Sequence, residues 1–107
     1  MIDHTAFFGD GQKRFALTDP MITELERITD TGIGALYLRI VASQFRLVEL
    51  SEIIRLGLIG AGTNPQEAMR LVDTYAKDRP LSEVFPLALD ILDSRWSGKV
   101  EVQNGQA

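Results

Sequence analysis

The stretch from Leu56 to Ala68 constrains the fold of this chain more than any other segment. It reads L-G-L-I-G-A-G-T-N-P-Q-E-A, so glycines interrupt the end of an apolar run and an Asn-Pro pair follows within a few residues. Asn64 can serve as a helix N-cap, and Pro65 suits the first helical position because its missing N–H would have no partner there. One helix therefore ends near Ala61 and another begins after Asn64, and the two meet at a packed corner.

The glycines of this corner allow more than one interpretation. A phosphate-binding loop follows a strand and opens a helix, whereas Gly57, Gly60 and Gly62 close an apolar helix in the reverse order of the dinucleotide fingerprint. A DNA-reading helix-turn-helix is disfavoured as well, because Glu67 stands at the front of the second helix in an acidic chain. We expect close helix packing and a C-cap here.

Apolar residues that recur at helical spacing predict about five helices. The first is expected at about 20–31, the second from about 33 with a stripe that reaches 45, the third from about 49 or 51 to 61, the fourth at 65–77 and the fifth at 80–96. The third is apolar around most of its circumference and is expected to be the central one. The apolar stripe of the second includes Val41 and is extended by Phe45, and Leu81 and Trp96 are placed on the inner face of the fifth.

The N-terminal segment, about residues 4–17, is predicted to form a β-hairpin. An Asp-Gly pair separates two short apolar runs, which is a strong signal for a tight turn. With Asp10 and Gly11 as the turn residues, Phe8 lies opposite Lys13. Because side chains alternate along a strand, Phe8 faces the core and its neighbour Phe7 faces away from it.

The chain length allows one hydrophobic core and is too short for two ordinary domains. The predicted fold class is mainly α (α+β): an N-terminal β-hairpin followed by a compact bundle of about five helices. We expect a single domain over residues 1–98. Residues 99–107 are polar and uncapped, and we expect them to form a flexible C-terminal tail.

Few residues offer chemistry. The chain has no cysteine and a single histidine, His4, and it lacks the usual spacings of metal ligands. Paired carboxylates are interpreted as solvated helix faces; the pairs are Glu24 with Glu26, Glu49 with Glu52, and Asp90 with Asp93. We therefore predict no catalytic, cofactor-binding or metal-binding residue and no enzymatic activity.

Net charge and hydropathy argue against nucleic acids and membranes as partners of this chain. A formal charge of −4 and a pI near 4.9 oppose binding to a phosphate backbone, so we expect no nucleic acid partner. No window approaches the ~20 apolar residues that span a bilayer, and the N-terminus lacks the pattern of a secretory signal. We expect no membrane partner and a cytoplasmic location in a bacterial host cell.

Four aromatic residues are candidates for contact with a protein partner: Phe7, Tyr37, Phe45 and Trp96. Burial in the core is the alternative for each of them. For Phe7, we form the hypothesis that it and the hairpin edge make a contact surface for strand addition by another chain. The alternative is that Phe7 packs on the stem of Arg14 or under the C-terminal tail.

The order and spacing of several motifs resemble the gene-transfer-agent family of phage tail assembly chaperones. The motifs follow the hairpin and are L-T-D-P-M-I-T-E-L-E at 17–26, T-G-I-G-A-L at 31–36, L-I-G-A-G at 58–62, P-Q-E-A at 65–68, P-L at 80–81 and W-x-G at 96–98. The resemblance covers Phe8 to Lys99. It implies a non-enzymatic protein that binds the tape measure protein and keeps it soluble during tail assembly. The tail tube protein is a further implied partner, and self-association is compatible with this function.

Two alternatives to the chaperone function stay open at the level of the sequence. One is a structural tail or neck component that is retained in the finished particle. The other is a non-enzymatic regulatory module that binds another protein.

Overall fold

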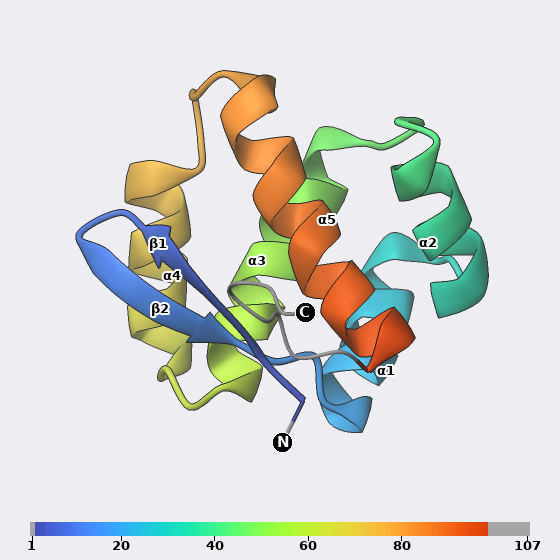
Figure 1. Ribbon diagram of the computed structural model, residues 1–107, viewed down its shortest axis with the longest axis horizontal. Helices are drawn as coiled ribbons and strands as arrows, with labels where there is room; N and C mark the ends of the chain where they lie inside the picture. The colour runs from blue at the N-terminus through green and yellow to red at the C-terminus, as the bar shows by residue number, and fades with distance from the viewer. Residues whose placement is uncertain (1, 99–107) are drawn as a thin grey trace, which may run out of the picture.

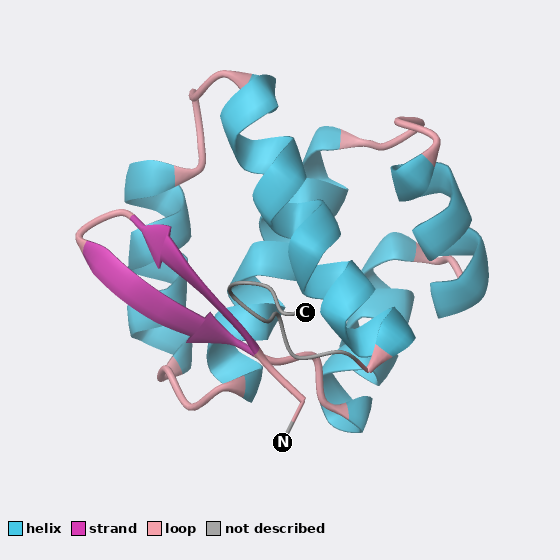
Figure 2. Cartoon of the chain, viewed as in Figure 1, coloured by secondary structure: helices cyan, strands magenta, loops and turns pink. Residues whose placement is uncertain are grey.

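The computed structural model describes residues 2–98, and within them a two-stranded hairpin precedes five helices (Figures 1 and 2). The strands are β1 (His4–Phe8) and β2 (Gly11–Phe15), and the helices are α1 (Asp19–Thr29), α2 (Ile33–Val41), α3 (Leu47–Gly60), α4 (Pro65–Tyr75) and α5 (Leu81–Ser97). The predicted fold class, an N-terminal hairpin followed by about five helices, is confirmed. The predicted tail over residues 99–107 lies outside the described residues.

Helix α3 occupies the centre of the molecule, as its apolar circumference predicts. It contacts β2, α1, α4 and α5, and Figure 1 shows α5 crossing in front of it. Its buried side chains face several neighbours at once, which explains why hydrophobic residues are not confined to one stripe. They include Leu50, Ile53, Ile54, Leu56 and Leu58.

The hairpin turn differs from the prediction. Phe8 pairs with Gly11, not with Lys13, so Gly9 and Asp10 form the turn. Gly9 has φ +69°, and a Cβ atom there would lie 2.4 Å from Cδ2 of Tyr75, so the close contact with α4 requires glycine at this turn position. The register is shifted by two residues. An even shift leaves each side chain on its predicted face.

The glycines at the end of α3 form a notch for the chain that leaves the hairpin. A Cβ atom on Gly60 would lie 1.8 Å from the carbonyl oxygen of Ala16, and one on Gly57 would lie 3.2 Å from Cβ of Phe15. Within this notch the N–H of Ala16 donates a 2.8 Å hydrogen bond to the carbonyl of Gly57. Close packing of another helix is found only at Gly57, where an added Cβ would lie 3.3 Å from Cγ2 of Ile91 of α5, whereas Gly60 packs against the hairpin exit, which the sequence did not predict.

Several helix boundaries lie one to four residues from their expected places. Thr18, not Asp19, is the N-cap of α1, and its hydroxyl accepts a hydrogen bond from the N–H of Met21. Helix α3 begins at Leu47, because the Glu49 carboxylate accepts a 2.9 Å hydrogen bond from the N–H of Arg46 and caps the helix start.

The prediction of which residues face the core is wrong at three positions of α2 and α5. Val41, Leu81 and Trp96 are each about half exposed. Helix α2 lies at the edge of the bundle and ends at Val41, so Phe45 falls in the connection that follows it. Leu81 and Trp96 occupy the first and last turns of α5, beyond the part that crosses the central helix.

The N-cap of α4 leads to a stability prediction. Asn64 Oδ1 accepts a 2.8 Å hydrogen bond from the N–H of Glu67, and Pro65 follows as expected. Asn64→Ala should lower the free energy of unfolding by about 1 kcal/mol, because an otherwise unbonded helix N–H loses its acceptor. Urea denaturation checks this. Gln66→Ala, an exposed change on the same helix turn, is the control, and equal effects from the two substitutions would contradict the capping role.

Candidate interaction surfaces

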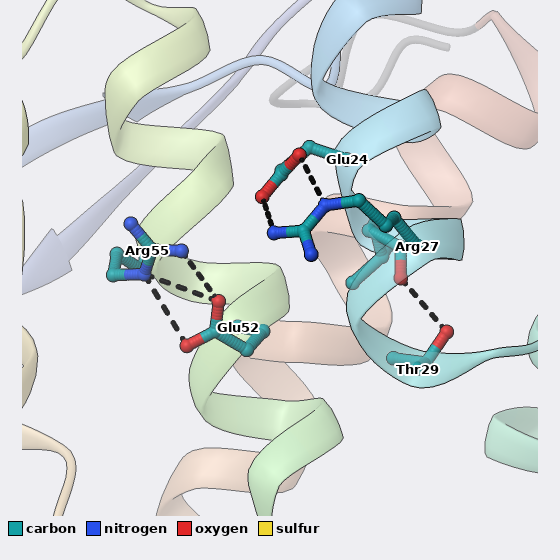
Figure 3. Close-up of polar contacts among 6 residues, drawn as sticks. Glu24, Arg27, Thr29, Glu52 and Arg55 are labelled. Atoms are coloured by element: carbon teal, nitrogen blue, oxygen red, sulfur yellow. Dashed lines mark hydrogen bonds and ion pairs between the residues drawn. The ribbon is translucent and has the colours of Figure 1, made fainter.

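Several carboxylates on the helices are paired with an arginine three residues further along the same helix, as Figure 3 shows for α1 and α3. Glu24 pairs with Arg27 on α1, and Glu52 pairs with Arg55 on α3. No group of three or more histidine or acidic side chains within residues 2–98 is arranged to hold a metal ion. Over the same part of the chain, no helix is long and apolar enough to cross a bilayer.

Glu49 is the exception to the interpretation of the carboxylates as solvated. Its side chain is 0% exposed. Arg39 of α2 approaches it with both terminal nitrogens, at 3.2 and 2.6 Å from the two carboxylate oxygens. Burial opposes the charge, but the Arg39 guanidinium and the N–H of Arg46 outweigh it and hold the pKa of the Glu49 carboxyl below its usual value of 4.5. Glu49 therefore ties α2 to the start of α3.

Cations are neutralised locally across the described surface. The chain has 11 lysines and arginines. Lys99 lies outside the described residues, and each of the others forms an ion pair with a carboxylate of the same chain. The cations of residues 2–98 are thus neutralised locally, and the carboxylates in excess of them, Asp78 among them, leave this surface net negative.

Phe7 projects from the face of the hairpin that points away from the bundle. Its side chain is 68% exposed. Thr5 and Arg14 are paired across the strands, as are Phe7 and Gln12, so these four residues share one face. We call this the outer hairpin face. The Arg14 guanidinium is bound to Asp3 at 3.1 Å.

Tyr37 and Trp96 form an exposed aromatic stack. Their ring centroids are 4.2 Å apart and the planes are inclined by 6°. The Tyr37 hydroxyl donates a 2.7 Å hydrogen bond to Asp93 of α5, which raises the pKa of the phenol. The stack joins α2 to the end of α5, and Trp96 keeps 55% of its surface exposed. These two predicted contact residues therefore lie together.

Phe45 lies apart from the other candidates. It stacks on Phe85 of α5, with ring centroids 5.2 Å apart, and it is partly buried against the core. Its main contact is thus within the molecule. Whether Phe7, Tyr37, Phe45 and Trp96 bind a partner stays a prediction.

An apolar groove between α3 and α4 was not predicted from the sequence. It has a volume of about 640 Å³ and is closed at one end by the start of α5. We call it the α3–α4 groove. Leu47 and Met69, on opposite sides, are 63% and 53% exposed, and the remaining apolar lining comes from Val48, Val72, Ala76 and Leu81. One residue could have indicated the groove from the sequence. Met69 is apolar although it lies on the polar side of α4, where helical spacing requires no apolar residue.

The family model described as phage tail tube protein, GTA-gp10, matches residues 1–98. No curated protein and no solved structure matches the chain.

This match corrects the function predicted from the sequence. The resemblance to a gene-transfer-agent tail family is confirmed, but the description of the matched family is that of a tube protein, which is a structural component. The prediction of a chaperone for the tape measure protein is therefore wrong. The motifs indicate the family but do not separate a tail subunit from an assembly factor, because no residue in them is tied to a chemical step that only one of the two performs.

Proposed function

Because the chain belongs to the family of phage tail tube proteins described as GTA-gp10, we propose that it is a structural subunit of a phage-type tail and is retained in the finished particle. The observation that carries this proposal is the extent of the family match. It spans residues 1–98, which includes every strand and helix of the fold. The proposed function thus belongs to the whole folded body.

The surface of the molecule supports a structural, non-enzymatic function. Its cations are neutralised by local pairs, while Leu47, Val48, Met69 and Leu81 are exposed together around the α3–α4 groove. Exposed apolar side chains rimmed by polar groups are typical of surfaces that bind other proteins. Such surfaces suit a subunit that is buried on several sides in an assembly.

The proposed partners are further copies of this chain and the neighbouring proteins of the tail. Tubes are built by repeating one contact between identical subunits, and such a contact joins two different surfaces of the same molecule. Binding of the tape measure protein is a finer prediction, which rests on the resemblance alone.

Analysis of purified particles tests the proposed function. We expect the chain to co-purify with tailed particles at a constant ratio to other tail proteins, as measured by quantitative mass spectrometry. Deletion of its gene should yield particles without complete tails, and supplying the gene in trans should restore them. Presence in lysates during assembly combined with absence from washed particles would contradict the proposal.

A further inference from the structure

Two of the exposed apolar features within residues 2–98 are the Phe7 side chain and the α3–α4 groove. We propose that they bind each other between copies, with Phe7 of one copy inserted into the groove of the next. This contact presupposes the proposed function, since a tail subunit has to bind further copies of itself.

The sizes of the two features are compatible. The groove has a volume of about 640 Å³, within the range of about 300–1,000 Å³ that is typical of binding pockets, so it accepts one aromatic ring and part of the strand that carries it. Aromatic side chains, phenylalanine included, are enriched at the buried centres of protein interfaces, and residues that fill a well-packed, desolvated pocket contribute most of the binding energy. Phe7 is the only large apolar side chain on the outer hairpin face.

The hairpin holds Phe7 in a fixed position before binding. On the opposite face, Phe8 packs edge-to-face against Phe15 and Tyr75, with ring centroids 6.1 and 6.2 Å away. Gly9 is pressed against the ring of Tyr75 at the turn. A side chain on such a clamped strand loses little conformational entropy when it docks.

Charge complementarity favours the same pairing. Arg14 lies diagonally across from Phe7 on the outer hairpin face and is half exposed. At the rim of the groove, Asp73 is paired with Lys77, whereas the Asp78 carboxylate has no ion-pair or hydrogen-bond partner in the described part of the chain. Arg14 binds Asp3 through Nε and Nη2, so in the proposed contact its Nη1 is the group that donates to the Asp78 carboxylate of the next copy.

The two surfaces lie on different sides of α4. Tyr75 contacts the hairpin, whereas Met69 and Val72 line the groove. Figure 1 shows the hairpin lying in front of α4. When two copies bind through two different surfaces, one copy still has a free Phe7 and the other a free groove. Further copies can therefore add, and the assembly grows into a ring or a helical stack and does not stop at a symmetric dimer.

Complementation between two variants tests the contact. Phe7→Ser removes the inserted side chain, and Met69→Lys places a cation in the groove that repels Arg14. Each variant alone should lose at least about tenfold in its self-association constant, measured by sedimentation velocity. An equimolar mixture should form discrete dimers, because each variant keeps the surface that the other lacks. Leu38→Ser, an exposed change on α2, is the matched control and should associate like the native chain.

A charge exchange gives a second, independent test. Arg14→Asp and Asp78→Arg should each weaken association, and the two changes combined in one chain should restore it. Because the chain has no cysteine, a Phe7→Cys, Met69→Cys double variant reports the contact directly. It should form a ladder of disulfide-linked multimers on oxidation, and either single variant should not. Circular dichroism checks that every variant stays folded.

The results of these experiments distinguish failure of the proposed contact between Phe7 and the groove from failure of the proposed function. A native chain that stays monomeric at the highest soluble concentration and yields no disulfide ladder overturns the contact. So does unchanged association of Phe7→Ser. If Met69→Lys associates normally but is missing from particles, the groove binds another tail protein and the contact is again overturned. In all these cases, the presence of the native chain in particles still decides the proposed function by itself.

Discussion

Substitution of Gly60 by alanine should destabilise the fold more than any other single-methyl change. The added Cβ atom would lie 1.8 Å from the carbonyl oxygen of Ala16 and 3.2 Å from Met21. The nearest atom belongs to the backbone, so no side-chain rotation can relieve the overlap. We expect a loss of about 3 kcal/mol or more, at the upper end of overpacking effects, because the hairpin exit has to move away from α3 and the hydrogen bond from Ala16 to Gly57 is strained or lost.

Helix propensity predicts the opposite sign for the same substitution. Alanine is favoured over glycine within a helix by about 1 kcal/mol, so a purely local effect would stabilise Gly60→Ala. Gly34 supplies the matched control: it lies in the first turn of α2, and no atom comes within 4 Å of an added Cβ. Gly34→Ala should therefore stabilise the protein by about 0.5 kcal/mol.

Gly57 is expected to give an intermediate result. Its added Cβ would lie 3.2 and 3.3 Å from side-chain atoms of Phe15 and Ile91, which can shift slightly. Thermal unfolding followed by circular dichroism should thus rank the four proteins, from most to least stable, as Gly34→Ala, native, Gly57→Ala and Gly60→Ala. If Gly60→Ala melts at or above the native temperature, the notch does not hold the hairpin exit.

The fold was largely predictable because its signals are local. Pro20 and the Asn64-Pro65 pair mark the starts of α1 and α4 to within a residue, and the apolar circumference of α3 identifies the central helix. The hairpin register was predicted wrongly because the choice between Gly9-Asp10 and Asp10-Gly11 depends on Tyr75, which is distant in sequence. Val41 and Leu81 were misplaced for a similar reason, since helical spacing does not tell which part of a stripe its neighbours cover.

The candidate surfaces were predictable only in part. Alternation along a strand is enough to place Phe7 outside, and its exposure follows directly. The α3–α4 groove depends on the separation of two helices, which no local pattern encodes. Glu49 was misassigned because a carboxylate buried by a partner from another helix has the same sequence signature as a solvated one.

Removal of the Arg39 side chain should have the second largest effect on stability. In Arg39→Met, the Glu49 carboxylate would stay buried without its guanidinium, which costs about 3 kcal/mol. This value lies at the lower end of the usual range because the N–H of Arg46 still donates to Glu49. Urea denaturation measures the loss. Arg27→Met, which breaks the exposed pair with Glu24, is the matched control and should cause no measurable change.

The pH dependence of this loss identifies its cause. In the native protein the folded pKa of Glu49 lies below the unfolded value of 4.5, so the stability from its ionised form is present above 4.5 and is lost as the pH falls through the folded pKa. In Arg39→Met, burial acts without the opposing cation and raises the folded pKa above the unfolded one. The free energy of unfolding of the variant is then lowered at neutral pH, where Glu49 would have to be ionised while buried, and it recovers as the pH falls and Glu49 becomes protonated. The difference in unfolding free energy between the two proteins should thus shrink as the pH is lowered from neutral toward 4.5.

A double substitution separates the cost of an unpaired charge from the loss of packing. Arg39→Met combined with Glu49→Met removes both charges and keeps apolar volume at both positions, and such replacements of buried pairs are often neutral or stabilising. We therefore expect the double variant to regain most of the stability lost in Arg39→Met and to lose its distinctive pH dependence. If it is as unstable as the single variant at every pH, packing by the Arg39 stem, not the charge of Glu49, holds α2 against α3. The buried pair would then stabilise this corner mainly through its aliphatic atoms.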